Sequence, residues 1–193
     1  MAENNKRNYG ISAVQIRMET LANQVKLAIR DVPDFPKEGI IFKDITPILK
    51  DHTLCKVIVD EMANQVADLQ LDAIACIESR GYWFGALLAQ KLQLPFIPIR
   101  KAGKLPYKTV SHSYDLEYGS AIIEMHEDAI EKGWNVLIHD DLLATGGTAI
   151  ATAELIKKFG TVAGFSFLVD LTFLGGTPKL KPYADKVVSI VEY

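Results

Sequence analysis

The sequence predicts an α/β fold with a central, mostly parallel sheet flanked by helices. Strand-like and helix-like segments alternate along most of the chain, which is the pattern of parallel strands joined by crossover helices. The strand-like segments, such as "DAIACIES" at residues 72–79, are nearly continuous apolar runs, as expected of strands buried on both faces. With 193 residues and 49% hydrophobic content, the chain can bury one substantial core, so we predict a single domain over residues 1–193.

The amino-terminal part predicts a helix, an ordered loop and a second helix. Residues 12–31 begin with a capping serine and carry apolar residues at helical spacing. Residues 32–47 hold three prolines and a glycine, which favour a loop, yet the segment is too apolar to stay open to water. A second helix is predicted at residues 53–69. We expect a helix and covering loop over about residues 12–47 and a core over about residues 53–193.

The rest of the chain continues the alternation and includes one polar, glycine-bearing segment, residues 102–119, that predicts a mobile loop. Because parallel sheets place ligands at the carboxyl ends of their strands, a site is expected at that edge. Helices are predicted at 84–93 and 148–160, and strands at 72–79, 95–101, 118–130, 134–141, 161–171 and 186–193.

One strand end carries more polar residues than a turn requires: "NVLIHDDLLATGGTAIATAELIKKFG", residues 135–160. Backbone N–H groups at a helix start lack internal partners and lie at the positive end of the helix dipole, so a loop of small residues there can bind phosphate. Gly146 and Gly147 allow close approach of the backbone. The hydroxyls of Thr145 and Thr148 can donate to phosphate oxygens.

Two adjacent acids, Asp140 and Asp141, precede this loop. Consecutive strand residues face opposite ways, so we expect no carboxylate dyad. Carboxylates beside a phosphate site suit the hydroxyls of a sugar, or a metal held directly or through water. The pattern therefore predicts a sugar phosphate as ligand, and the alternative is an acidic helix start after an ordinary turn. The nucleotide fingerprints GxxxxGK[ST] and GxGxxG after a strand are absent.

Charge and cysteine content exclude several classes of protein. The 21 basic and 24 acidic residues give a net charge of −3, which argues against a broad nucleic-acid surface. Cys55 and Cys76 have no CxxC or Cys/His spacing, so we predict reduced core residues. The start "MAENNKRNYG" does not resemble a signal peptide, and no apolar run approaches a membrane span. We expect a cytoplasmic protein without nucleic-acid or membrane partners.

The stretch "VLIHDDLLATGGTA" closely resembles the phosphoribosyl-pyrophosphate signature of the type I phosphoribosyltransferase family. Four further segments, "DFPKEGIIFKDITPIL", "ESRGYWFG", "IRKAGKLPY" and "YDLEYG", are similar to those of family members that use adenine, in the same order and at about the same spacing. The resemblance covers the chain from about Val32 to its end. It implies the family's fold, a mostly parallel sheet flanked by helices with a small hood that covers the base.

The implied reaction is a purine salvage step in which adenine and phosphoribosyl pyrophosphate give AMP and pyrophosphate. The resemblance also implies Mg²⁺, bound through pyrophosphate and ribose with no direct protein ligand assigned, and a homodimer in which one subunit lends a lysine to its neighbour. Positive charge builds up on the ribose as pyrophosphate departs, so preorganised electrostatics should dominate catalysis.

The resemblance assigns the sugar-phosphate and pyrophosphate contacts residue by residue. Asp140 and Asp141 would hold the ribose hydroxyls and temper the developing cation. Arg80, a guanidinium fork just beyond a strand, would bind pyrophosphate, and a cis peptide is implied between Glu78 and Ser79. Without the resemblance, Arg80 could equally be a surface arginine paired to Glu78. Further substrate contacts are implied for Ser79, Arg100, Lys101, Lys104, Ala144, Thr145, Gly146, Gly147 and Thr148.

The remaining assignments concern proton transfer and the base. Glu117 would be the acid/base residue and Tyr118 would accompany it in a closing loop, although Glu117 could also be an ordinary exposed acid. Phe42 and Leu142 would sandwich the adenine ring. Main-chain groups of Ile41 and Lys43 would read its edge. A site that pairs with an exocyclic amine rejects an oxo group, so hypoxanthine should be a poor substrate.

Three residues depart from the family pattern: Lys43 replaces a common arginine, Ala102 a basic residue and His139 a valine. His139 is either inert packing or an electrostatic influence on the two aspartates. Two other functions stay open, namely the same transfer to hypoxanthine, guanine or xanthine, and a non-catalytic regulator that senses phosphoribosyl pyrophosphate. The first thirty residues are too few for an added DNA-binding domain with its own core.

Overall fold

The structure, a computed structural model, describes residues 13–115 and 120–193, with side chains for residues 21–114 and 120–193. Two compact units divide the chain, Met1–Asp51 and His52–Tyr193. The described part contains no helix with the length and apolar character needed to cross a membrane.

The smaller unit contains helix α1 (Ala13–Ala28), strands β1 (Arg30–Pro33) and β2 (Ile41–Asp44) and the 3-10 helix η1 (Thr46–Lys50). The predicted helix is confirmed, but a loop over residues 32–47 is wrong, because β1 and β2 pair as an antiparallel hairpin. Its turn uses positive φ angles at Asp34 and Gly39, and the Asp34 carboxylate accepts the Gly39 N–H at 2.8 Å. Prolines are tolerated in a two-stranded hairpin, where both strands are edges and a ladder donor is not needed everywhere.

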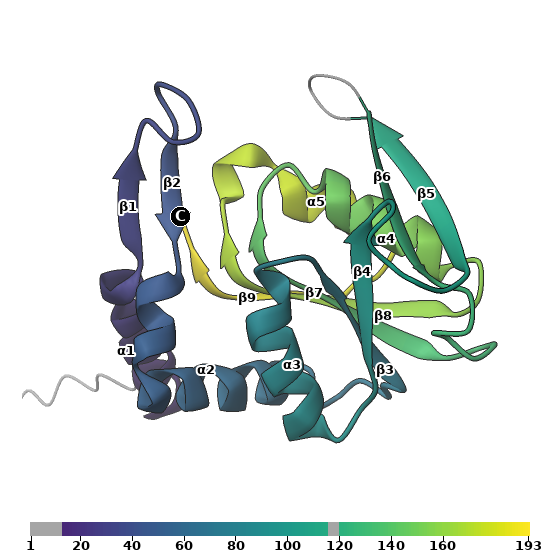
Figure 1. Cartoon of the computed structure of the whole chain (residues 1–193). Coiled ribbons are helices and arrows are strands. Elements are labelled where there is room, and N and C mark those ends of the chain that lie inside the picture. The colour runs from purple at the N-terminus through teal and green to yellow at the C-terminus, as the bar shows by residue number, and fades with distance from the viewer. Residues whose placement is uncertain (1–12, 116–119) are drawn as a thin grey trace, which may run out of the picture. The chain divides into compact units, whose positions relative to one another are not determined.

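The larger unit is built on a seven-stranded sheet with the order β5-β6-β4-β3-β7-β8-β9 (Figure 1). Five neighbouring strands of this sheet run parallel, namely β4, β3, β7, β8 and β9. Strands β5 and β6 form an antiparallel extension beside β4. The predicted mostly parallel sheet is confirmed. The elements are α2 (His52–Gln65), β3 (Ala73–Ile77), α3 (Gly81–Leu92), β4 (Phe96–Lys101), β5 (Thr109–Asp115), β6 (Ser120–His126), β7 (Asn135–Leu143), α4 (Gly147–Ile156), β8 (Thr161–Asp170), η2 (Thr172–Leu174), α5 (Gly176–Leu180) and β9 (Val187–Glu192).

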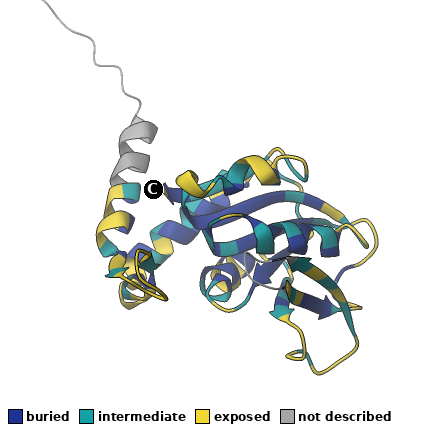
Figure 2. Cartoon of the chain, turned by 90° about the horizontal axis from the view of Figure 1, so that it is seen from above, coloured by how far each residue is buried: buried dark blue, intermediate teal, exposed yellow. Residues whose placement is uncertain are grey.

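Helices cover both faces of this sheet because the chain crosses over in two directions. From β3 the chain passes through α3 to β4 on one side, and from β7 it passes through α4 to β8 on the other. Right-handed crossovers in opposite directions place α3 and α4 on opposite faces, as Figure 1 shows. Strand β3 is buried along its whole length and β8 at all but Thr161 and Ala163, and Figure 2 shows the buried positions concentrated along the central strands. The carboxyl ends of these strands therefore extend from a well-packed core.

The predicted mobile loop at residues 102–119 is wrong for residues 109–115, which form β5 in continuous register with β6. Val110, His112 and Tyr114 are partly buried, whereas Ser111 and Ser113 between them are exposed. This alternation is typical of a strand with one covered face. The segment was expected to be a loop because the exposed residues of this strand, Ser111 and Ser113, are polar and give it the composition of a loop.

Packing between α3 and the sheet leaves no room for a side chain at Gly85. A methyl group there would collide with Cys76 Sγ and come to 3.1 Å from His139 Cδ2, and both of these residues are fully buried. Gly85→Ala should therefore lower the free energy of unfolding by about 1–3 kcal/mol, measured by urea denaturation. Cys76→Ala removes the sulfur atom, so the loss should shrink in that background. An equal loss in both backgrounds would contradict this packing.

Candidate functional site

A loop of small residues joins β7 to α4 at the carboxyl edge of the sheet. Gly146 is the N-cap of α4 with φ of +87°, and no side chain caps the helix start. The first amides of α4 therefore have neither an intrahelical nor a side-chain partner, and they lie at the positive end of the helix dipole. Thr145 is exposed, and Gly147 and Thr148 are partly buried. This arrangement suits an anion at residues 144–148.

Helix α5, which was not predicted, lies directly against this loop. A methyl group on Gly176 would collide with the Ala144 carbonyl oxygen and come to 2.9 Å from Leu143 Cδ1. Lys179 Nζ donates to the Thr145 carbonyl at 3.1 Å. Lys179 therefore brings a cationic group to this loop. A five-residue helix gives too short a pattern to be recognised in the sequence.

Asp140 and Asp141 occupy the end of β7 beside this loop. Asp140 Oδ1 accepts the Asp141 N–H at 2.8 Å, and Arg80 lies 2.7 Å from Asp141 Oδ2. Burial raises the pKa of Asp140, and the Asp141 charge raises it further. Burial also raises the pKa of Asp141, while Arg80 opposes that rise. The two acids are linked within β7, because the Asp140 carboxylate folds back onto the following amide.

The start of α3 approaches the acids closely. A methyl group on Gly81 would come to 2.7 Å from Asp140 Oδ1 and 3.0 Å from Asp140 Cα, so a larger residue would displace that carboxylate. Arg80, the N-cap of α3, stands at the same helix start and contacts Asp141. The segment after β3 therefore leaves room for the Asp140 carboxylate at Gly81. It also supplies Arg80, the cation that pairs with Asp141. The peptide between Glu78 and Ser79 is cis, as the resemblance implied.

The basic residues at the end of β4 are held by Glu78. Its carboxylate accepts Arg100 Nε at 2.8 Å and the Lys101 N–H at 3.0 Å, and it lies 2.8 Å from Lys104 Nζ. Arg100 also donates to the Lys104 carbonyl at 2.9 Å. The alternative that pairs Arg80 with Glu78 is wrong, because Arg80 pairs with Asp141. Ala102 makes only a backbone hydrogen bond here, to Ile122.

Glu78 should make stability depend on acid pH. Burial raises its pKa, but hydrogen bonds from Lys104, Arg100 and the Lys101 amide outweigh burial and lower it from 4.5 to about 2. A lowered folded-state pKa contributes stability that is present above pH 4.5 and is lost as pH falls toward 2. Urea unfolding at pH 7 and pH 3 should show a smaller loss of stability in Glu78→Gln than in the wild type. Equal pH dependence would contradict this assignment.

His139 lies below the two acids in β7 and is fully buried. Both ring nitrogens lack a hydrogen-bond partner among the described residues. Burial lowers the pKa of His139 to about 4, although the Ser166 backbone opposes the shift, so the ring is neutral near pH 7. Of the two readings of this residue, packing is the better supported, since a neutral ring adds no charge beside the aspartates.

Of the other predicted residues, Ser79 and Leu142 adjoin Arg80 and Asp141 in the chain, and three belong to the smaller unit. Glu117 and Tyr118 lie outside the described residues. Ser79 is exposed and Leu142 partly buried. In the smaller unit, β2 carries Ile41, Phe42 and Lys43. Ile41 is exposed, Phe42 packs edge-on against Phe35 with ring centroids 5.1 Å apart, and Lys43 Nζ lies 2.7 Å from Asp31.

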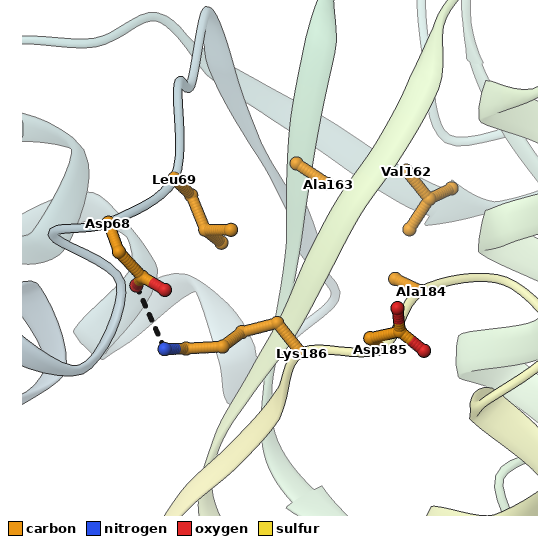
Figure 3. Close-up of a pocket in the computed structure, with 7 residues that line it drawn as sticks. All are labelled: Asp68, Leu69, Val162, Ala163, Ala184, Asp185 and Lys186. Atoms are coloured by element: carbon orange, nitrogen blue, oxygen red, sulfur yellow. Dashed lines mark hydrogen bonds and ion pairs between the residues drawn. The ribbon is translucent and has the colours of Figure 1, made fainter.

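A pocket of about 420 Å³ lies away from all predicted residues, beside the amino ends of β8 and β9 (Figure 3). It is lined by Asp68, Leu69, Val162, Ala163, Ala184, Asp185 and Lys186. An ion pair of 2.8 Å joins Asp68 and Lys186 there. Ligands of open α/β sheets bind at carboxyl ends, and this pocket is at the opposite edge. Cys76 is buried as predicted, but Cys55 is only partly buried.

Comparison with known proteins agrees with this geometry. The family described as "Phosphoribosyl transferase domain" matches residues 46–189. An adenine phosphoribosyltransferase of Cytophaga hutchinsonii is 56% identical over 176 residues, covering 91% of this chain and 97% of that protein. An adenine phosphoribosyltransferase of Pseudothermotoga lettingae is 53% identical, covering 83% of this chain and 95% of that protein.

Solved structures give the same result. A crystal structure of adenine phosphoribosyltransferase from Thermoanaerobacter pseudethanolicus has a TM-score of 0.86 and 46% identity, covering 89% of this chain and 99% of that one. The enzyme from Saccharomyces cerevisiae, complexed with adenine and an imino-altritol bisphosphate, has a TM-score of 0.82 and 38% identity, covering 89% of this chain and 99% of that one. The chain therefore belongs to the adenine phosphoribosyltransferases of the type I phosphoribosyltransferase family.

Proposed function

We propose that this protein transfers the phosphoribosyl group of phosphoribosyl pyrophosphate to adenine, with AMP and pyrophosphate as products. One observation carries the proposal: the aspartate pair of β7 stands in the strand that leads into the uncapped start of α4, and one of the two, Asp141, pairs with a cation, Arg80. Sugar phosphates need all three kinds of group at once. The membership established above fits this reaction, which belongs to purine salvage.

The chain's residues divide the work by charge. Amides and hydroxyls of residues 144–148 bind the 5'-phosphate. Arg80, with Arg100, Lys101 and Lys104 from the end of β4, binds pyrophosphate, which leaves with the electrons of its bond to C1 of the ribose. A base nitrogen then forms the new bond to C1. Asp140 and Asp141 hold the ribose hydroxyls and stabilise the cationic ring between these two events, which is an electrostatic role and not a proton transfer.

Proton transfer and base recognition follow the resemblance. Glu117 takes the proton from the imidazole ring of the base as the new bond forms. We assign the adenine ring to Phe42 and Leu142, and its edge to main-chain groups of Ile41 and Lys43. Because the Lys43 ammonium is bound to Asp31, the lysine side chain is not required for this recognition.

Mg²⁺ fits this set of residues. The two aspartates are carboxylates whose pKa values are raised by burial, and a bound cation stabilises their ionised forms. Among the described residues, no three His, Cys, Asp or Glu side chains form a metal cluster, so the ion would be shared with the substrate. When bound, Mg²⁺ neutralises charge on pyrophosphate as it departs. We also propose that the protein is a cytoplasmic homodimer.

The direct test is turnover with separate bases. Adenine, hypoxanthine, guanine and xanthine are each supplied with phosphoribosyl pyrophosphate and Mg²⁺, and product formation is followed spectrophotometrically. Adenine should be used at a kcat/KM at least about 10³-fold above that of hypoxanthine. A preference for an oxopurine contradicts the proposed base, and absence of turnover with all four bases supports a sensor of phosphoribosyl pyrophosphate instead.

A further inference from the structure

The Thr148 hydroxyl contacts a residue with no assigned role, Tyr114. Thr148 is the second residue of α4, and its carbonyl accepts the Thr152 hydroxyl at 2.9 Å. Its own hydroxyl is not used to cap the helix. Instead, Thr148 Oγ1 lies 3.2 Å from the Tyr114 hydroxyl. Either oxygen could donate at this distance, so the direction of the bond must be decided from what else the threonine does.

Tyr114 is held in place by the sheet and not by the loop between β7 and α4 (residues 144–148). It is paired with Ala121 in the β5–β6 ladder, and its ring packs against the hydrophobic core. The ring also approaches the loop, since a methyl group on Gly147 would lie 3.9 Å from Tyr114 Cδ2. The Tyr114 hydroxyl oxygen is therefore held in place, and the Thr148 hydroxyl proton, which can rotate about the C–O bond, orients relative to it.

The number of hydroxyl protons decides the direction. A threonine hydroxyl has one proton and lone pairs, and only the proton stabilises an adjacent anion. If Thr148 donated to Tyr114, its lone pairs would face the phosphate and repel it. If Tyr114 donates, the Thr148 proton is left for a phosphate oxygen, and the two bonds form a chain that strengthens both.

We propose that Tyr114 is a positioning residue that donates to Thr148 Oγ1 and so directs the Thr148 proton to the 5'-phosphate of the substrate. This inference rests on the proposed function, because it requires a phosphate at the start of α4. It adds a residue of β5 to the recognition of the phosphate, outside the loop that contacts it. The effect should appear in the affinity for phosphorylated sugars more than in the turnover of bound substrate.

A double-mutant cycle with ribose 5-phosphate tests the proposal, with binding measured by calorimetry. Tyr114→Phe should raise Kd about three- to tenfold, and Thr148→Val should raise it by at least as much. In the Thr148→Val background, Tyr114→Phe should have no further effect. In turnover, Tyr114→Phe should raise KM for phosphoribosyl pyrophosphate with little change in kcat. Tyr183→Phe is the matched control, because its hydroxyl bonds Glu154, nearer the other end of α4, and it should leave Kd unchanged.

The outcomes separate this inference from the proposed function. If the wild type binds ribose 5-phosphate and Tyr114→Phe binds it equally well, the inference is overturned and the proposed function stands. An equal loss in both Thr148 backgrounds also overturns it, because the tyrosine would then act on the fold and not through Thr148. If the wild type does not bind ribose 5-phosphate, both are overturned.

Discussion

Replacing Asp140 and Asp141 together by asparagine should lower kcat/KM by about 10³-fold or more while the protein remains folded. In the proposed mechanism the carboxylates stabilise positive charge on the ribose ring, and asparagine keeps their size without that charge. Each single variant should lose less than the pair, and the two losses should not add, because Asp140 Oδ1 accepts the Asp141 N–H and the Asp141 charge raises the pKa of Asp140. Steady-state kinetics with phosphoribosyl pyrophosphate and adenine measure the loss, and circular dichroism checks the fold.

Asp72→Asn is a matched control for this experiment. Asp72 is also an aspartate bound to a backbone N–H of β7, that of Asn135 at 2.8 Å, but it lies at the opposite end of the strand. Its replacement should leave turnover unchanged. A near-normal rate in the Asp140/Asp141 double variant would mean that these acids are not beside the reacting sugar.

Arg80→Leu should lower kcat/KM by about 10²- to 10³-fold, because it removes the proposed pyrophosphate contact and leaves Asp141 without its cation. Arg80→Lys should lose less, since it keeps the charge without the planar fork. Lys186→Met, which breaks the ion pair to Asp68 at the other edge of the sheet, is the control and should retain activity.

The same variant makes a prediction about pH. Arg80 opposes the burial that raises the pKa of Asp141, so its removal should raise that pKa further. Turnover that needs ionised aspartates is lost as pH falls through their pKa values, so the acidic limb of the pH–rate profile should move to higher pH in Arg80→Leu. Arg80→Leu should destabilise the protein most at pH values above the pKa of Asp141, where Asp141 is charged. This destabilisation should fade at pH values below that pKa. An unchanged acidic limb would contradict the ion pair.

The parallel core of the fold could be predicted because its strands leave a strong local signal. Runs such as "AIACI" are apolar throughout, and the small residues after β7 mark the end of a strand and the start of a helix. The hairpin of β1 and β2 was missed because Pro33 and Pro36 lower strand propensity locally, whereas pairing between two edge strands tolerates them. Strand β5 was missed because polar residues on its exposed face gave it the composition of a loop.

Contacts between distant segments could not be predicted at all. Nothing in the residues around Arg80 identifies Asp141 as its partner, and the nearer acid, Glu78, was the natural alternative. Likewise, Lys179 donates to the Thr145 carbonyl in the loop between β7 and α4, and it does so from a helix too short to predict. These contacts depend on the order of strands in the sheet, which brings together at one edge segments that are 61 residues apart (Arg80 and Asp141) and 34 residues apart (Thr145 and Lys179). The roles of all the predicted site residues, Glu117 and the base-contacting residues among them, stay predictions.

A crystal structure with AMP tests the central claim most directly. The phosphate should lie within hydrogen-bond distance of the amides of residues 145–148, with the ribose hydroxyls on Asp140 and Asp141. AMP bound instead in the pocket beside Asp68 and Lys186, with the start of α4 empty, would contradict the account.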